Sequence, residues 1–511
     1  MREVDVVIVG SGFSGLAISV LLDRAGIHSY VVLEKGADVG GTWRENTYPG
    51  AACDIPSHLY SFSFEPNPTW TRSYSPQKEI QAYLRRVADK YDVRRRTRFN
   101  AAVKSALWDD ASGTWAVETA DGMTYRARAI VLGVGGLHLP AFPNIAGLES
   151  FEGTRFHSAQ WNHAYDLTGK TVAVIGTGAS SIQLVPQIAP GVKELHLFQR
   201  TPPWIIPKPD HDISERARAL YSRVPAVQQL VRTALYWNQE WKAAPLMGKA
   251  PRLAKVGEWV ARRYLRQSIS DPALREKLTP HYQMGCKRIL LSNDYYPALT
   301  RPNVELVTNG IERIEKEGVR TADGKLRAVD AIILGTGFKV AEYLSSVRIE
   351  GTEGRDLNEM WRKETQTYLG ITVSGFPNMF LLMGPNTGLG HNSMIFMIEA
   401  QARYAAMCIR ALRDKKLKSL DVREDVQREF NEVLQTRTKG TVWASGCKSW
   451  YQNDEGRNLA IWPGYTVEYW LETRKPKLEH YVQSTLSSAA VSRPLPATKD
   501  PASHAAAIPA R

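Results

Sequence analysis

The 511-residue sequence predicts an α/β fold with two β-α-β units, because one pattern of strand, glycine-rich turn and helix occurs twice. In the first copy, apolar strands at residues 4–9 and 29–33 flank a G-x-G-x-x-G turn and a helical pattern. In the second copy, strands at 171–175 and 194–198 flank a similar turn and helix. This order of elements is typical of a Rossmann-type unit that binds a dinucleotide.

The rest of the chain completes two domains around these units. Trp108, Trp115 and an Asp121-Gly122 turn indicate a hairpin, and residues 331–334 form another buried strand pattern. The predicted parts are a first nucleotide-binding domain at 1–143 and 340–483, a second at 151–212 and 279–339, a helical insertion at 213–278, and a disordered tail at 484–511.

The predicted insertion is basic and rich in aromatic residues. Its helical pattern carries Tyr221, Trp237, Trp241, Trp259 and Tyr264. We expect these rings to pack between helices. Association with a membrane surface is an alternative that the pattern leaves open without favouring it.

The composition is that of a soluble, cytoplasmic protein. Hydrophobic residues make up 43% and charged residues 23% of the chain, and no apolar run is long enough to span a bilayer. The four cysteines form no C-x-x-C motif, which fits a reducing cytosol and argues against a redox disulfide or a zinc knuckle. The net charge is +13, but Lys and Arg are spread along the chain, so we expect no nucleic-acid partner. No spacing of His and carboxylates calls for a metal.

The first glycine turn has the context of a nucleotide site. Gly10, Gly12 and Gly15 would let the backbone turn tightly and approach a pyrophosphate at the N-terminus of the helix. Glu34 ends the second strand, where its carboxylate would accept hydrogen bonds from the ribose hydroxyls. We expect FAD here.

The second turn is G-x-G-x-x-S, formed by Gly176, Gly178 and Ser181. Arg200 follows Gly176 by 24 positions, the same offset that separates Glu34 from Gly10. A guanidinium binds a 2′-phosphate that a carboxylate would repel, and Thr201 adds a hydroxyl donor. The second site is therefore predicted to prefer NADPH over NADH.

Two further segments resemble those of the type I Baeyer–Villiger monooxygenases, a branch of the flavin-containing monooxygenases. Residues 40–54 are similar to that family's G-G-x-W-x(4)-Y-P-G-x(3)-D motif. Residues 151–162 are similar to its F-x-G-x(3)-H-x(3)-W fingerprint, with Asn162 where Pro or Asp is usual. Residues 383–393 resemble the branch that includes aryl-ketone monooxygenases. Relatives that oxidise N and S atoms usually carry Tyr or Phe at the position of Trp161.

The resemblance implies a reaction and its machinery. NADPH would reduce FAD, O₂ would add at flavin C4a, and the resulting peroxyflavin would convert a ketone into an ester or lactone. By similarity, Arg288 is the cation that stabilises the peroxide and Asp54 is its carboxylate partner. Lys287 resembles the residue that reaches the NADPH 2′-phosphate. An arginine suits the first task because its side chain stays protonated.

The resemblance assigns other residues to the cofactors. Thr42 and Trp43 would line the flavin, and Tyr60 and Val103 match positions that contact FAD. For Asn386 a flavin contact and an ordinary glycine-rich loop remain alternatives. Further along the chain, Trp450 resembles a residue that contacts NADP, and the effect of His157 in the second fingerprint is expected to be conformational.

Three other functions compete with the Baeyer–Villiger reaction. One is an N- or S-oxygenating flavin monooxygenase, against which Trp161 and the Asp54 and Arg288 pair argue. Another is a flavin reductase or oxidase that never oxygenates a substrate. A third is a nucleotide-binding interaction protein without turnover, which the two glycine fingerprints disfavour.

Overall fold

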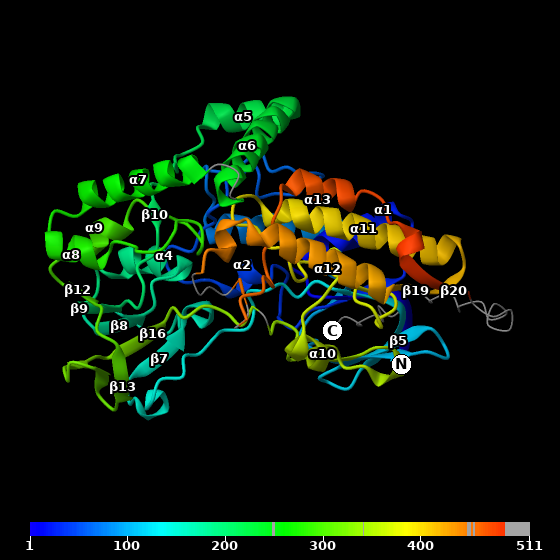
Figure 1. Ribbon diagram of the computed structural model, residues 1–511, viewed down its shortest axis with the longest axis horizontal. Coiled ribbons are helices and arrows are strands. Elements are labelled where there is room, and N and C mark those ends of the chain that lie inside the picture. Colours follow the sequence, from blue (N-terminus) through cyan, green and yellow to red (C-terminus); the bar gives the residue numbers. More distant parts are fainter. Residues whose placement is uncertain (248–250, 341, 447–450, 453–454, 486–511) are drawn as a thin grey trace, which may run out of the picture.

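The computed structural model describes residues 1–511 except 248–250, 341, 447–450, 453–454 and 486–511, and the side chains of 243–246, 251 and 252 (Figure 1). The described residues form two main sheets, which lie at opposite ends of the molecule in Figure 1. Each is built around one of the two predicted β-α-β units.

The larger sheet surrounds the first unit. In the described ranges its eight strands are β1 (Arg2–Val9), β2 (Tyr30–Leu33), β3 (Thr97–Arg98), β4 (Val103–Asp109), β5 (Thr114–Thr119), β6 (Thr124–Leu132), β17 (Arg348–Glu350) and β18 (Met379–Leu381). Their order is β17-β4-β5-β6-β1-β2-β3, with β18 also paired to β6. The pairs β1–β2, β1–β6, β2–β3 and β18–β6 are parallel, whereas β4, β5 and β6 form the predicted hairpin region.

Alternate side chains of β1 enter different cores because successive strand residues point to opposite faces. Val6 and Ile8 pack on the face covered by α1 (Phe13–Arg24), α3 (Gln77–Lys90) and α11 (Met394–Asp414). Val7 and Val9 belong to the core of the other face. The sheet is therefore buried on both sides, as its nearly continuous apolar strands predict.

The smaller sheet surrounds the second unit. Its described strands are β7 (Thr154–His157), β8 (Thr171–Ile175), β9 (Glu194–Phe198), β12 (Val304–Val307) and β16 (Ala331–Leu334), in the order β12-β9-β8-β16-β7 and all parallel. Helices α4 (Ala179–Ile188) and α9 (Tyr295–Leu299) pack on one face. A small sheet of β13 (Ile311–Glu315), β14 (Gly318–Thr321) and β15 (Leu326–Ala328) covers the other.

Further described helices and short strands lie outside these sheets. They are α2 (Thr42–Glu45), α10 (Leu357–Lys363), α12 (Glu424–Lys439), α13 (Thr466–Glu472), the paired strands β10 (Ile205–Ile206) and β11 (Leu290–Leu291), and the paired strands β19 (Leu417–Val422) and β20 (Tyr481–Thr485). Ser484 and Thr485, which composition alone assigns to the tail, are strand residues paired with β19.

Helices occupy the predicted insertion: α5 (Glu215–Arg223), α6 (Pro225–Leu246), α7 (Pro251–Ser268) and α8 (Pro272–Lys277). The expectation that its rings pack between helices holds for Tyr264, whose ring lies 5.3 Å from that of Tyr296. It is wrong for Trp237, Trp241 and Trp259, which are 56%, 66% and 53% exposed. Helical periodicity alone does not reveal which face of a helix is covered.

The cysteines depart from the expectation of reduced thiols at one position. Among the described cysteines, Cys53 and Cys408 are buried free thiols, whereas Cys286 is disulfide-bonded. A disulfide depends on the distance between two cysteines in space, and the spacing of cysteines along a sequence does not report it.

Trp115 of β5 provides a test of the larger core. Its side chain is fully buried and its indole N–H donates to the Pro377 carbonyl, at 2.9 Å. We expect Trp115→Ala to lower the free energy of unfolding by about 3–5 kcal/mol, because it creates a cavity and leaves that carbonyl without its donor. The exposed Trp237→Ala is the control and should change it by less than about 0.5 kcal/mol. Urea unfolding of both variants measures the difference, and equal effects would contradict the assigned core.

Candidate cofactor sites and active site

The first glycine turn lies at the carboxyl end of β1, and two of its glycines are required by the fold. A Cβ on Gly10, whose φ is +95°, would lie 2.7 Å from the Gly133 carbonyl oxygen. A Cβ on Gly15 would lie 1.9 Å from the Gly10 carbonyl oxygen. Gly12 is different, because its Cβ would make only ordinary contact, 3.6 Å from Gly41. A close-approaching ligand is the remaining physical reason for a glycine at this position.

The second turn repeats this arrangement at the carboxyl end of β8. A Cβ on Gly176, whose φ is +108°, would lie 2.5 Å from the Gly335 carbonyl oxygen. A Cβ on Gly178 would meet no described atom within 4 Å. Ser181 is fully buried, and its hydroxyl fills the space above Gly335 without a hydrogen-bond partner among the described residues.

Both turns lead into helix ends that suit an anion. Among the residues that the structure describes, no side chain caps the N-terminus of α1 or of α4, and neither first turn contains an acidic residue. The first N–H groups of a helix have no partner within the helix, and the helix dipole favours a negative charge beside them. The backbone N–H groups beside Gly12 and Gly178 are therefore donors that fit a pyrophosphate.

Glu34, at the end of β2, binds the turn itself. Its carboxylate accepts hydrogen bonds from the N–H and hydroxyl of Ser11, at 2.8 and 2.7 Å, and from the Gly36 N–H at 2.8 Å. It also forms an ion pair with Arg44, at 2.8 Å. Burial alone would raise the pKa of Glu34, but Arg44 and these donors hold it below its ordinary value. The carboxylate is thus ionised, and its contact with a ribose stays a prediction.

Two cations lie near the second turn. Arg200 is exposed just beyond β9, and Lys287 is half-buried with its ammonium 5.0 Å from the ring of Tyr282. Burial and the charge of Arg200 lower the pKa of Lys287. Two cations near enough to repel each other are the electrostatic setting of an anion site. Thr201 lies beside them, and its carbonyl accepts a hydrogen bond from Thr177.

Arg288 and Asp54 meet where the regions of the two sheets face each other. Arg288 precedes β11, and Asp54 follows the segment that contains α2. The guanidinium Nε donates to Asp54 Oδ2 at 2.8 Å, and a terminal nitrogen lies 2.6 Å from the same oxygen. The carboxylate raises the pKa of Arg288 further above its ordinary value, so the cation is permanent. The predicted pair is therefore brought together.

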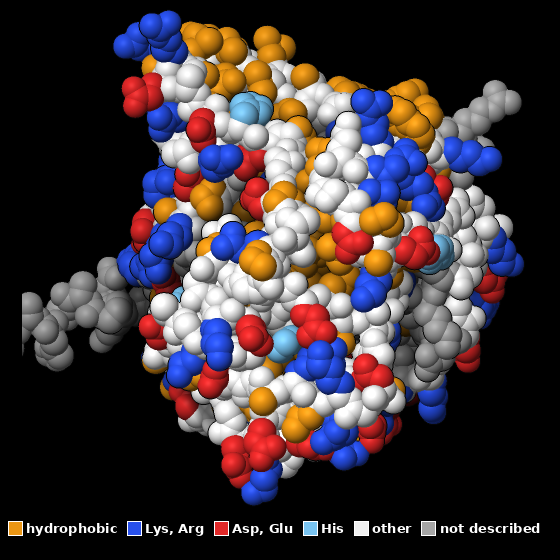
Figure 2. All heavy atoms as spheres, turned by 90° about the vertical axis from the view of Figure 1, so that its left-hand side faces the viewer, with side chains coloured by type: hydrophobic (Ala, Val, Ile, Leu, Met, Phe, Trp, Pro, Cys, Tyr) orange, Lys and Arg blue, Asp and Glu red, His pale blue; other side chains and the backbone are white. Residues whose placement is uncertain are grey.

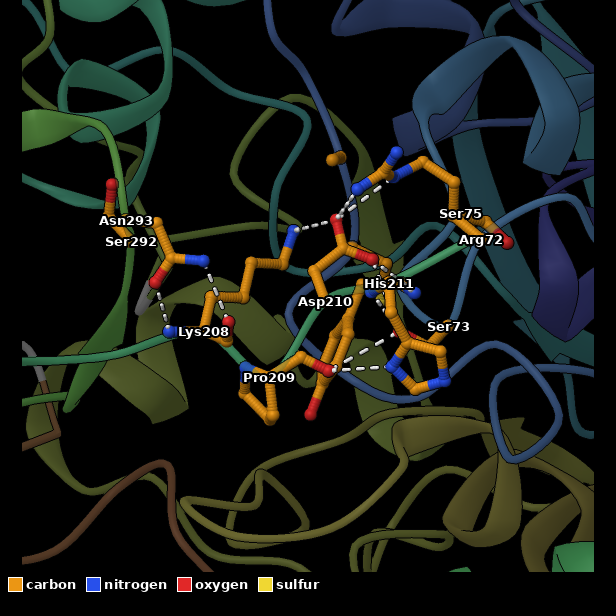
Figure 3. Close-up of polar contacts among 12 residues, drawn as sticks. Arg72, Ser73, Ser75, Lys208, Pro209, Asp210, His211, Ser292 and Asn293 are labelled. Carbon is orange, nitrogen blue, oxygen red and sulfur yellow. Dashed lines mark hydrogen bonds and ion pairs between the residues drawn. The ribbon is translucent and has the colours of Figure 1, made fainter. Parts of the chain in front are cut away.

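Other polar residues lie near this ion pair, and no sequence motif identifies them. Figure 3 shows Lys208 and Asp210 from one side of the face, and Arg72 and Ser73 from the other. Arg72 Nε donates to Asp210 Oδ2 at 3.1 Å, and Ser73 bonds to the same carboxylate. Burial lowers the pKa of Lys208, against the opposing influence of Asp210 and Asp54. Only the tertiary structure brings these residues together.

The expected flavin-lining residues lie around α2. Thr42 begins α2, and the indole of the buried Trp43 donates to the Tyr60 hydroxyl at 3.1 Å. Val103 is buried at the start of β4. Asn386 donates to the Asn458 carbonyl at 2.7 Å, which gives it a structural bond in its loop.

Other predicted contacts are not tested by this arrangement. The cofactor contacts of the residues around α2 stay predictions. Trp450 lies outside the described residues.

His157 and Trp161 both pack against aromatic rings, and the conformational effect expected of His157 stays a prediction. The His157 ring is fully buried, and its neighbours are the rings of Phe142 and Phe338. These two residues lie in the segments that connect the two sheets, Phe142 between β6 and β7 and Phe338 between β16 and β17. Its Nδ1 accepts from the Ala159 N–H at 3.1 Å, and burial lowers its pKa. Trp161 packs edge-on against Phe156, 5.0 Å away.

The described residues contain neither a cluster of metal-binding side chains nor a helix suited to a membrane span. They contain no group of three or more His, Cys, Asp or Glu side chains that could hold a metal ion. None of the helices among these residues is both long and apolar enough to cross a membrane.

Comparisons with known proteins agree with this geometry. A family model described as pyridine nucleotide-disulphide oxidoreductase matches residues 7–234. Relatives named Baeyer-Villiger monooxygenase, from Pseudomonas aeruginosa and Streptomyces coelicolor, are each 47% identical; the alignments cover 96% and 94% of this chain and 93% and 92% of the relatives.

Solved structures are similar over nearly the whole chain. An oxidised steroid monooxygenase bound to NADP is 31% identical with a TM-score of 0.85, covering 94% of this chain and 100% of that one. A structure of OTEMO in complex with FAD and NADP is 27% identical with a TM-score of 0.84, covering 94% and 99%. With its relatives, this chain belongs to the Baeyer–Villiger monooxygenase family of flavin monooxygenases.

Proposed function

We propose that this chain uses FAD, NADPH and O₂ to insert one oxygen atom beside the carbonyl of a ketone, giving an ester or lactone. The observation that carries the proposal is the Arg288 guanidinium, fixed by Asp54 at the face between the two sheets. The names of the relatives and the two uncapped helix ends support it.

The cofactors are assigned by the fit of each turn. FAD would lie at the Gly12 turn with its ribose toward Glu34 and its ring toward Thr42 and Trp43. NADPH would lie at the Gly178 turn with its 2′-phosphate toward the cations described above. Similar solved structures, one described with NADP and one with FAD and NADP, support the choice of these two cofactors.

The chemistry divides between the cofactors and the chain. Bound FAD would supply the redox chemistry, because a flavin accepts electrons from NADPH and activates O₂. Arg288 supplies a fixed positive charge that stabilises an anionic oxidant and the oxyanion formed from a ketone. Asp54 holds the guanidinium in place, and the partial burial of the pair strengthens the effect of its charge. A ketone is the substrate class because an anionic, nucleophilic oxidant attacks carbonyl carbon.

Substitutions in the two glycine turns should weaken the binding of different cofactors. Gly12→Ala should weaken FAD binding, whereas Gly178→Ala should weaken NADPH binding and leave FAD bound. The added methyl group would lie beside the helix end, where it makes only ordinary contact with Gly41 at position 12 and meets no described atom within 4 Å at position 178. Flavin absorbance after gel filtration and titration with NADP measure the two affinities. Loss of FAD from Gly178→Ala would reverse the assignment.

Arg200 should determine the choice of nicotinamide cofactor. Arg200→Ala removes a charge-assisted contact with the 2′-phosphate, which contributes about 1.5–3 kcal/mol, so KM for NADPH should rise about tenfold or more. KM for NADH should stay nearly constant, because NADH has no such phosphate. Arg301→Ala, another exposed arginine, is the control. An unchanged ratio of the two KM values in Arg200→Ala would contradict the second site.

Arg288 should separate cofactor oxidation from oxygenation. Arg288→Ala should still oxidise NADPH, while ester formation falls about 10²-fold or more because the fixed charge is lost. The control Arg72→Ala breaks a second ion pair of the same face and should keep the ratio of ester to NADPH. Product analysis by mass, with a ketone panel, gives both rates.

Two results would overturn this assignment. If Arg72→Ala loses ester formation as completely as Arg288→Ala, the role of Arg288 is structural. If the wild-type enzyme oxidises sulfides and amines but no ketone of the panel, the chain is an N- or S-oxygenating enzyme.

A further inference from the structure

Helix α6 turns a polar face toward the protein and exposes an apolar stripe. Leu230, Trp237 and Trp241 are 70%, 56% and 66% exposed. With Ala234 they recur at intervals of three or four residues, which places them on one stripe of the helix. The buried polar residues of the same helix are Gln228, Arg232, Gln239 and Glu240.

Hydrogen bonds to the larger domain fix this orientation. Arg232 donates to the His58 carbonyl at 2.7 Å. Glu240 accepts from Asn392 at 2.6 Å and from the Thr466 hydroxyl at 2.6 Å. Breaking such buried charged contacts is costly, so the apolar stripe stays directed away from the protein.

Helix α7 adds a second apolar stripe. Val256 and Trp259 are 54% and 53% exposed, and Leu253 and Val260 are exposed beside them. Of the fifteen large hydrophobic side chains exposed in the described part of the chain, nine lie between residues 220 and 260. Figure 2 shows hydrophobic side chains gathered along the upper edge of the molecule, where Figure 1 places α5 and α6. An exposed apolar surface of this extent marks an interaction site.

The same region is strongly cationic. Residues 213–278 contain 13 Lys or Arg and 5 Asp or Glu, a net charge of +8 out of +13 for the chain. Lys255 is exposed beside Val256, and the Arg263 guanidinium lies 5.4 Å from the ring of Trp259. Exposed tryptophans interspersed with Lys and Arg are typical of helices that lie in the interface of an anionic bilayer.

We propose that the exposed face of α5, α6 and α7 docks on the surface of an anionic lipid bilayer. The helices would lie along the interface, with Trp237, Trp241 and Trp259 among the acyl chains and the cations at the headgroups. A second copy of the chain fits this face less well, because a symmetric dimer would bring two regions of like charge together. An anionic bilayer complements both the apolar stripes and the charge.

Flotation of the FAD-loaded full-length protein with vesicles tests the proposal. Wild-type protein should float with phosphatidylcholine vesicles that contain phosphatidylglycerol, and much less with phosphatidylcholine alone. The double variant Trp237→Ser with Trp241→Ser should bind about tenfold or more weakly, because two apolar anchors are lost. Leu471→Ser is the matched control, since Leu471 on α13 is 57% exposed and lies outside the insertion. It should float like the wild type.

The charges give an independent test. Lys255→Ala and Arg263→Ala should each weaken binding about fivefold, and added salt should weaken wild-type binding. Bound-flavin absorbance and NADPH oxidation without vesicles should match the wild type, which shows that the variants are folded.

Three results would overturn the proposal. The first is wild-type protein that floats with neither vesicle. The second is an equal loss of binding in Leu471→Ser. The third is a wild-type dimer, seen without lipid by sedimentation equilibrium, that the tryptophan variant converts to monomer, because the face would then be an interface between copies.

Discussion

The ion pair between Arg288 and Asp54 links the regions of the two sheets, and the proposed chemistry depends on it. The two residues are 234 positions apart in the sequence. The pair therefore exists only when both regions are folded and packed together. Tyr48 supports the same face through Gln183, at 2.8 Å, and Arg72 through Asp210. Because the pair is one-third exposed or less, its charge borders the space where cofactors would meet while remaining partly shielded from water.

Charge is distributed differently at the two nucleotide turns. At the first, Glu34 is ionised and tied to Ser11 and Arg44, so the strand end presents a neutralised carboxylate. At the second, Arg200 and Lys287 repel each other. A ligand with an extra phosphate relieves this repulsion, whereas one without it leaves the repulsion in place. We therefore expect the two turns to differ in ligand preference, because different side chains lie at the ends of β2 and β9.

The sequence predicts the local features of this molecule well and the tertiary ones less well. The strands at 171–175 and 194–198 and the glycines beside them follow from short-range pattern and backbone geometry. Lys208 and Asp210 are absent from that prediction, because no local motif links them to Arg72. The Arg288 and Asp54 pair was accessible only through the resemblance to a family.

Helix α6 shows why amphipathicity does not always identify the buried face. The surface beneath it offers the carbonyl of His58 and the side chains of Asn392 and Thr466, and these groups need polar partners when buried. Apolar side chains turned toward them would leave several unsatisfied, each at a cost of about 1–3 kcal/mol. The polar face is therefore the one that packs. A helix rule that assigns apolar residues to the core fails here because the neighbouring surface, rather than the helix, decides its orientation.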